Sequence, residues 1–376
     1  MNNKIEIFSQ WYYIKNIDSI DSPALIIYAE RVAENINTLK SMIDNVQRLR
    51  PQVKTNKTKE ATLLMMEAGI KKFKCATIAE AEMLALTNVP DVLLAYQPVG
   101  PKLQRFITLI KKYPFTKFSC LTDNLSSAKK IASAAIENEI EIPVYIDINA
   151  GMNRTGILPV DNAVELYMAC AKTNGIKPVG LHCYDGHIRA SDFRQRTIEC
   201  DNAFNELSLI QKKLIERNFP APVIIAGGSP TFPIHAKRKD VECSPGTFIY
   251  WDKSYQDLYS EQNFVTAALV ISRIISLPDE TKLCLDLGHK SISTENELHR
   301  RVYFLNAPEL KFISQGEEHL VVEANAGHSY KIGDVLYGLP FNICATCALY
   351  DRVSTTENDE VTEEWKIIAR DRKISV

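Results

Sequence analysis

The feature that most constrains the fold is a regular alternation of short β-rich runs and helical patterns between about residues 24 and 250. Strand and helix in alternation predict parallel strands whose sheet faces are covered by helices. Repeated over this length, the pattern favours an α/β fold of the (β/α)8 TIM-barrel type, although an open doubly wound sheet has the same periodicity. The expected strands are VKT at Lys54, FKCAT, VLLAYQP, FSCLTD, PVYIDIN, VGLHCYD, VIIAGGS and TFIYWD.

The pattern changes after Asp252. Strand-like runs are separated by Asp, Gly, Pro and Asn without a clear helix between them, which predicts a mostly antiparallel β domain. We therefore expect a barrel domain over residues 20–253 and a C-terminal β domain over residues 254–376. Residues 1–19 are grouped with the β domain, although the sequence does not fix which domain they join. The β runs are AALVISRIISL, KLCLDLG, RVYFLN, EHLVVE, DVLYGLP and WKIIARD.

Composition argues against several classes of function. Lys and Arg total 44 against 46 Asp and Glu, so the chain has no positive excess for nucleic acid or an anionic membrane. It lacks the roughly 18 consecutive apolar residues of a membrane span and an apolar signal core. Its nine cysteines follow no disulfide-framework spacing, which favours reduced thiols. We expect a cytoplasmic protein.

Lys54 is the first candidate functional residue, because the active site of a barrel lies at the C-terminal ends of its strands. Strand alternation places Gln52 and Lys54 on one face and Val53 on the other. With Val53 packed toward the helices, Lys54 would point into the barrel. A lysine there is costly unless it is paired or used, and an amine can form an imine with an aldehyde cofactor. Lys57 and Lys59 are interpreted as ordinary surface lysines.

Two glycine-containing segments are candidates for binding a phosphate group. The seventh expected strand ends in AGGSPT (residues 226–231), and the eighth begins near CSPGT (residues 243–247). Glycines let backbone N–H groups approach an anion, and hydroxyls add donors. In barrels of this kind phosphates commonly lie at the loops after strands 7 and 8. Either segment alone is equally well explained as a tight turn, but the two together favour a phosphate.

Two other strand ends carry polar side chains. DINAGMNRTG (residues 147–156) holds Arg154 between two glycines, which indicates a loop that aims a cation inward; a surface arginine in a turn fits the same pattern. HCYDGH (residues 182–187) contains Tyr184, His187 and a second histidine. A lone histidine is more often structural, but this density of groups that donate, accept or stack favours a site.

In this order, RPQVKTNKT, DINAGMNRTG, GLHCYDGH, AGGSPT and SPGTFIYWD resemble the motifs of the D-threonine aldolase / D-serine dehydratase family. These are fold-type III pyridoxal-phosphate enzymes related to alanine racemase, and the resemblance runs from about Ser22 through Leu349. It implies pyridoxal 5'-phosphate as the cofactor and a small amino acid as the substrate. It also implies a barrel followed by a β domain, and a homodimer whose subunits both contribute to each active site.

The resemblance further implies roles for individual residues. Lys54 would form the Schiff base with the cofactor, and Arg154 would contact the cofactor's phenolic oxygen. The phosphate contacts would be Gly228, Ser229 and Thr231. The remaining catalytic residues, near the substrate, would be His187 and Tyr184, of which Tyr184 would also touch the cofactor.

The chain departs from the family at the expected metal site. Relatives typically show Pro-x-His-x-Cys or Pro-x-His-x-Asp, the metal pair of the metal-dependent members, where this chain has PFNICATC (residues 340–347). On a strand, Asn342 and Cys344 would share a face, which preserves the geometry of a two-ligand site. An amide oxygen is a hard ligand and a thiolate a soft one, so the pair is poorly matched for zinc. A divalent metal is therefore doubtful, and packed cysteines are favoured.

The expected function is that of a lyase acting on a small D-β-hydroxy amino acid. Aldol cleavage needs a base at the β-hydroxyl and dehydration needs an acid there, and the sequence does not choose between them. One alternative is an amino-acid racemase or epimerase, which requires bases on opposite faces of the substrate. The other is a non-catalytic pyridoxal-phosphate-binding protein, against which the long β domain argues.

Overall fold

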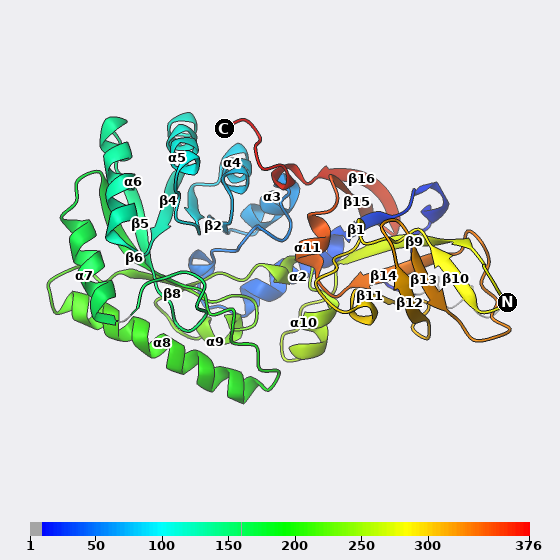
Figure 1. Cartoon of the computed structure of the whole chain (residues 1–376). Coiled ribbons are helices and arrows are strands. Elements are labelled where there is room, and N and C mark those ends of the chain that lie inside the picture. The colour runs from blue at the N-terminus through cyan, green and yellow to red at the C-terminus, as the bar shows by residue number, and fades with distance from the viewer. Residues whose placement is uncertain (1–9, 159) are drawn as a thin grey trace. The chain divides into compact units, whose positions relative to one another are not determined.

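The computed structural model describes residues 10–158 and 160–376, and the chain divides into two compact units (Figure 1). The first, here called the β unit, comprises the described residues up to Ile36 together with Thr247–Ile368. The second, here called the barrel unit, comprises Asn37–Gly246 and Ala369–Val376. Within the described residues, no helix has the length and apolar character needed to span a membrane.

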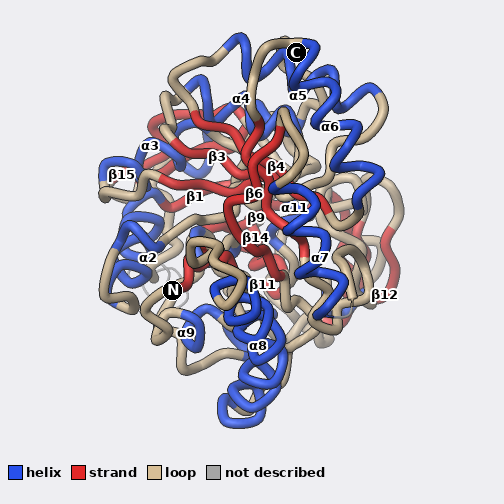
Figure 2. Tube along the Cα trace, turned by 90° about the vertical axis from the view of Figure 1, so that its left-hand side faces the viewer, coloured by secondary structure: helices blue, strands red, loops and turns tan. Residues whose placement is uncertain are grey.

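The barrel unit contains a seven-stranded parallel sheet in which each strand pairs with the next strand in sequence. The helices that alternate with these strands pack on the outside of the sheet (Figure 2). The strands are β2 (Lys72–Cys75), β3 (Asp91–Leu94), β4 (Lys117–Thr122), β5 (Ile142–Asp147), β6 (Ile176–Cys183), β7 (Val223–Ala226) and β8 (Val241–Cys243). The helices are α3 (Lys59–Glu67), α4 (Ile78–Leu86), α5 (Pro101–Lys112), α6 (Leu125–Glu137), α7 (Val160–Ala171), α8 (Phe193–Ile215) and α9 (Phe232–His235).

Side-chain caps fix where several of these helices begin. The side chains of Thr58, Thr77 and Asn124 each accept a hydrogen bond from the backbone N–H three residues later. This interaction satisfies one of the N–H groups that the first turn of a helix leaves without a partner. In α4 the cap is reciprocal, because the Glu80 carboxylate accepts from the backbone N–H of Ala76 at 2.6 Å. These local signals place the helices between the strands.

The segment before Lys54 closes the ring between the two edges of the sheet. Leu49 forms a parallel bridge with Cys243 of β8, and Gln52 forms one with Lys74 of β2. The N–H of Lys74 donates to the carbonyl of Pro51 at 2.9 Å. The expected barrel fold is therefore confirmed, with seven regular strands and a first position made of isolated bridges.

Two of the expected strands are wrong in their details. VKT is not a strand, because the chain turns directly after Gln52. TFIYWD is not the eighth strand: Thr247–Ile249 is a 3-10 helix, and Trp251 has a φ of 45° that an extended strand does not allow. The eighth strand is the three-residue β8, so the CSPGT segment ends this strand instead of opening it.

The β unit contains a nine-stranded, mostly antiparallel sheet, as expected. Its main order is β12-β13-β10-β9-β1-β15-β16, and β14 pairs with both β9 and β11. The β1–β15 pair is parallel. The strands are β1 (Ala24–Tyr28), β9 (Ala268–Ser276), β10 (Lys282–Leu285), β11 (Val302–Phe304), β12 (Lys311–Gln315), β13 (Leu320–Glu323), β14 (Val335–Pro340), β15 (Arg352–Glu357) and β16 (Glu360–Lys366). Its helices are α10 (Lys253–Leu258) and α11 (Ile343–Cys347), and α2 (Ala29–Ser41), which follows β1, begins in the β unit and ends in the barrel unit.

The compact units differ from the expected domain boundaries at both ends of the chain. Residues 20–36 lie in the β unit, where β1 pairs with β9 and β15. Of the first nineteen residues, 1–9 lie outside the described part, and Tyr12 belongs to the core of the β unit. Residues 369–376 lie in the barrel unit, where the Glu82 carboxylate accepts from the backbone N–H of Ser375 at 3.0 Å. As a statement about folding domains, the division at residue 253 stays a prediction.

Asp252, in the β unit, predicts a measurable dependence of stability on pH. Its carboxylate accepts backbone hydrogen bonds from Tyr255 at 3.0 Å and Ile343 at 3.2 Å. Burial nevertheless raises the pKa of Asp252 to about 7. Between about pH 4 and this value the folded chain holds a proton that the unfolded chain has lost, so the stability from this group falls as the pH rises.

Asp252→Asn removes the ionisation. The melting temperature of the variant, taken relative to that of the wild type, should therefore rise as the pH increases from about 5 to about 8. Thermal melts of both proteins in matched buffers measure this difference. A difference that is constant over that range would contradict the assignment.

Candidate active site

The C-terminal ends of the parallel strands, here called the barrel mouth, bring most of the expected site residues into one region of the barrel unit. Lys54 lies in the turn that follows the bridging segment, and its side chain is exposed. Its backbone N–H lies 3.4 Å from the side-chain oxygen of Gln52. The strand alternation invoked for Lys54 is therefore wrong, and the turn after Gln52 positions it instead.

A second lysine of the barrel mouth was not recognised in the sequence. Lys74, in β2, is only 4% exposed. Burial, followed by the charge of Lys54, lowers the pKa of Lys74 to about 7, although Asp185 and Asp147 oppose the shift. Backbone hydrogen bonds join Lys74 to Pro51 and Val53, so β2 runs alongside the segment that leads to Lys54. The sequence signal was the KFKC run, where alternation puts Lys72 and Lys74 on the same face of a strand.

Tyr184 provides an aromatic surface shared by two cations. The guanidinium carbon of Arg154 lies 4.9 Å from the centre of the Tyr184 ring, and the Lys74 amine lies 5.9 Å from it. A Cβ added to Gly228 would approach the same ring to 3.0 Å. Tyr184 therefore connects the two cations with the glycine-containing loop after β7, and the distances suit cation–π attraction.

The loop that carries Arg154 is held in a defined shape. The Asn149 side chain accepts hydrogen bonds from the N–H groups of Gly151 at 3.1 Å and Asn153 at 3.0 Å. A Cβ at Gly151 would lie 2.7 Å from Nε2 of His187, so the exposed His187 imidazole packs against this loop. Glycine at this position is what allows the close approach.

A buried histidine–aspartate pair lies at the ends of β5 and β6. Nδ1 of His182 is 2.7 Å from the Asp147 carboxylate. Burial lowers the pKa of His182, and Asp147 only partly offsets it, since Lys74 and Arg154 add positive charge. Nε2 of His182 is buried without a hydrogen-bond partner among residues 10–158 and 160–376. Because a buried polar atom usually has a partner, this nitrogen is available to a ligand.

The two glycine-containing loops follow β7 and β8 and contact each other. The N–H of Gly246 donates to Oγ of Ser229 at 3.2 Å, and the N–H of Gly228 donates to Oγ1 of Thr231 at 3.3 Å. Oγ of Ser244 is buried with no hydrogen-bond partner in the described part of the chain. Loops after strands 7 and 8 are where barrels of this kind bind phosphate, and Ser244 is the donor in them that remains available.

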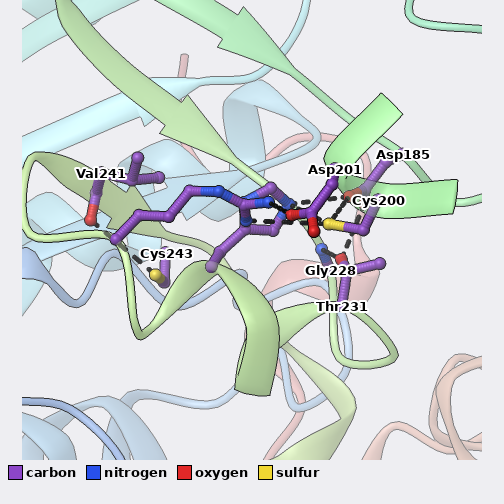
Figure 3. A network of polar contacts seen from close by, with 9 residues as sticks. Asp185, Cys200, Asp201, Gly228, Thr231, Val241 and Cys243 are labelled. Atoms are coloured by element: carbon purple, nitrogen blue, oxygen red, sulfur yellow. Dashed lines mark hydrogen bonds and ion pairs between the residues drawn. The ribbon is translucent and has the colours of Figure 1, made fainter. Parts of the chain in front are cut away.

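A buried network beneath these loops fixes Thr231 (Figure 3). The Thr231 hydroxyl donates to the Asp185 carboxylate at 2.9 Å, and Nε2 of His235 lies 2.8 Å from the same carboxylate. Burial would raise the pKa of Asp185, but His235 and Thr231 hold it below its usual value. Asp185 therefore acts as a charged acceptor that orients the loop.

Asp185, Cys200 and His235 lie close enough together to suggest a metal site, but the hydrogen bonds argue against one. Arg238 donates to Nδ1 of His235 at 2.9 Å, so the ring proton is on Nε2, the nitrogen that faces Asp185. A metal would have to displace that proton. Burial also raises the pKa of Cys200 to about 12, which disfavours the thiolate that a metal requires.

The expected metal pair, Asn342 and Cys344, lies in the β unit and not on a strand. Asn342 is the N-cap of α11, where its side-chain oxygen accepts from the N–H of Ala345 at 3.2 Å. Its amide nitrogen donates to Glu295. The shared strand face expected for the pair is therefore wrong, because the chain turns into a helix after β14. Both ends of the Asn342 amide are already bonded, so these residues do not present a matched metal site.

Two family models match the chain. The model described as alanine racemase, N-terminal domain, matches residues 27–254, more than half of the chain. This chain belongs to the alanine racemase N-terminal domain family. A second model, described as a putative serine dehydratase domain, matches residues 267–356. The family resemblance inferred from the motifs is thereby confirmed.

Relatives of this alanine racemase family member cover nearly its whole length. D-threonine aldolase of an Arthrobacter species is 23% identical over 359 residues, which is 93% of each chain. Among solved structures, D-threonine aldolase from Filomicrobium marinum has a TM-score of 0.85 at 23% identity, covering 96% of this chain and 98% of the other. D-threo-3-hydroxyaspartate dehydratase from Delftia has a TM-score of 0.76 at 22% identity, covering 93% and 97%. At these identities the structural likeness establishes the shared fold.

Proposed function

We propose that this chain is a pyridoxal-phosphate-dependent lyase that acts on a small D-β-hydroxy amino acid. The proposal rests mainly on one observation: the segment that leads to Lys54 is paired with β2, whose Lys74 shares the Tyr184 ring with Arg154, and the glycine-containing loop after β7 lies against the same ring. The names of the relatives support it, since an aldolase and a dehydratase of D-hydroxy amino acids both match nearly the whole chain.

The residues at the barrel mouth fit the cofactor. The loop of Gly228, Ser229 and Thr231 would bind its phosphate, Thr231 through its backbone because its hydroxyl donates to Asp185, and the buried hydroxyl of Ser244 offers a further donor. Arg154 would bind the phenolic oxygen, and Tyr184 would contact the ring. Lys54 would hold the aldehyde carbon covalently.

In the proposed reaction each of these residues would have a separate role. When bound, the cofactor supplies an electron sink for the bond broken at the substrate's Cα. Lys54, released by the incoming amine, would move a proton at Cα. His187 and Tyr184 would hold or move the proton of the β-hydroxyl, as a base for aldol cleavage or as an acid for dehydration. Arg154, through the phenolic oxygen, would keep the cofactor oriented.

A screen of D- and L-amino acids for carbonyl products tests this function. An aldehyde released from D-threonine, or an α-keto acid from D-serine, supports the lyase, and the product distinguishes cleavage from dehydration. Inversion of a single enantiomer without a carbonyl product would support the racemase instead. A protein that binds the cofactor and turns over no amino acid would leave the non-catalytic role.

Metal removal should have little effect on the lyase activity. Both ends of the Asn342 amide are already hydrogen-bonded, so it does not offer a free oxygen to a metal. Incubation with EDTA, followed by an assay of carbonyl release, should leave the rate largely unchanged. Complete loss of activity that a divalent ion restores would contradict this expectation.

Asp185→Asn should weaken binding of the cofactor's phosphate. The substitution removes the charged acceptor that orients the Thr231 hydroxyl, and a hydrogen bond to a charged group is worth enough to raise the dissociation constant about tenfold. Titration of the cofactor-free chain with pyridoxal 5'-phosphate measures this. The matched control is Asp201→Asn, which removes an exposed partner of Arg238. Equal affinity in the two variants would contradict the proposed role of Asp185.

We further propose that the active protein is a homodimer, as the family resemblance implies, and sedimentation of the purified chain would test this. A cytoplasmic location also stays a prediction.

A further inference from the structure

Lys74 lies alongside the segment that carries Lys54. Its backbone N–H donates to the carbonyl of Pro51 at 2.9 Å, and its carbonyl accepts from the N–H of Val53 at 3.0 Å. Gln52 is its register partner across this bridge. Because the backbone on both sides of Gln52 is bonded to Lys74, the position of the β2 lysine is fixed relative to the turn that presents Lys54.

The Lys74 side chain is buried, and its amine faces the Tyr184 ring instead of a carboxylate. At 4% exposure it forms no hydrogen bond or ion pair with any residue of 10–158 or 160–376. Lys72, two residues earlier on the same strand, does have such a partner, since it forms an ion pair with Glu242. A buried ammonium without a partner is costly, and proteins normally neutralise such a group instead. Lys74 is therefore suited to losing and regaining a proton.

The charged groups around Lys74 come from several elements. Lys54 and Arg50, from the bridging segment, disfavour its charged form, whereas Asp147 of β5 and Asp185 after β6 favour it. The charge of Lys74 contributes to lowering the pKa of His182. Arg154 contacts the same Tyr184 ring as Lys74. With burial, these effects bring the pKa of Lys74 to about 7. After burial, the charge of Lys54 is the largest of the effects that lower the pKa of Lys74.

We propose that Lys74 accepts the proton that the Lys54 ammonium must lose before its nitrogen can attack an aldehyde carbon. The N–H bond of Lys54 breaks and leaves its electron pair on that nitrogen, while the lone pair of Lys74 forms the new N–H bond. The Lys54 nitrogen would then bond to the aldehyde carbon while the C–O bond breaks, its two remaining hydrogens leaving with that oxygen as water, so nothing is oxidised or reduced. Lys74 acts through Lys54, so it is a positioning residue. This inference rests on the proposed function of Lys54.

The test is the rate at which the full-length, cofactor-free chain captures pyridoxal 5'-phosphate, followed by visible absorbance as a function of pH. Lys74→Met should slow capture at pH 7 by on the order of a hundredfold, the lower end of the contribution of a positioned acid or base. Its pH profile should move to higher pH, because solvent hydroxide must replace the missing acceptor. The matched control, Lys71→Met, changes an exposed neighbour just before β2 and should behave like the wild type.

Lys74→Arg separates proton acceptance from a purely electrostatic effect. Arginine keeps its charge, so it repels the Lys54 ammonium but cannot accept its proton, and capture should stay slow. If Lys74→Arg captured the cofactor at the wild-type rate, or if Lys74→Met had the pH profile of the wild type, the inference would be overturned and the proposed function would stand. A wild-type chain that captures no cofactor would instead refute the proposed function.

A second readout needs no cofactor and no Lys74 variant. Lysine side-chain resonances, followed by NMR through a pH titration, should show Lys74 holding its proton to higher pH in Lys54→Met than in the wild type. This shift is expected because the substitution removes a like charge while Asp147 and Asp185 remain. Identical titration of Lys74 in the two proteins would overturn the inference, even if the Lys74 variants fail to fold.

Discussion

Replacing Lys54 with alanine should abolish covalent attachment of the cofactor and lower the rate of carbonyl release by at least about 10⁴-fold, the scale seen when a catalytic nucleophile is removed. The reason is that alanine has no amine to form the bond to the aldehyde carbon or to move the proton at Cα. The measurement combines the visible absorbance of the purified protein with an assay on D-threonine and D-serine.

The matched control for this substitution is Lys59→Ala. Lys59 begins α3 only five residues further along the chain, and it is not one of the cations that contact the Tyr184 ring. It should keep both the colour and the activity of the wild type. If Lys54→Ala retained its visible band and its turnover, another lysine would have to hold the cofactor.

Replacing Arg50 with methionine should destabilise the barrel unit by about 3–5 kcal/mol, the cost of breaking a buried ion pair by removing one partner. Arg50 is 1% exposed and bonds to Asp91 at 2.6 Å and to Glu242 at 2.7 Å. The variant leaves the buried Glu242 carboxylate with Lys72 as its remaining partner, and the partly exposed Asp91 carboxylate without Arg50. Chemical denaturation followed by circular dichroism measures the loss.

An exposed pair provides the comparison for Arg50. Arg352 bonds to Glu364 at 3.0 Å in the β unit, and both side chains are more than half exposed. Since surface ion pairs contribute little, Arg352→Met should unfold at nearly the wild-type denaturant concentration. An Arg50→Met variant as stable as Arg352→Met would show that the charges inside the barrel do not hold its strands together.

Local periodicity predicted the barrel, but not the pairing of residues distant in the chain. The parallel strands β2 to β7 follow from apolar runs between capped helices. β8 was missed because it is three residues long, and the richer run after it, Phe248–Trp251, is buried without being a strand. Residues 24–28 were placed in the barrel domain, whereas their partners are strands more than 200 residues away. No local pattern carries that information.

The candidate site was predictable where chemistry follows directly from strand ends. Lys54, Arg154 and the loop after β7 belong to such positions in the barrel unit, where Arg154 and Gly228 lie against Tyr184. Lys74 was missed because the sequence alone does not show that a lysine in an apolar run is buried. The metal pair was misplaced because Asn342 is a helix cap, and the cap depends on the turn after Pro340, which strand alternation does not reveal.

The most direct test of the central claim is borohydride reduction of the purified, cofactor-loaded chain, followed by peptide mass spectrometry. The account predicts a pyridoxyl group on the peptide that contains Lys54, and on no other lysine. A label on Lys74 or elsewhere, or no label on a chain saturated with the cofactor, would contradict it.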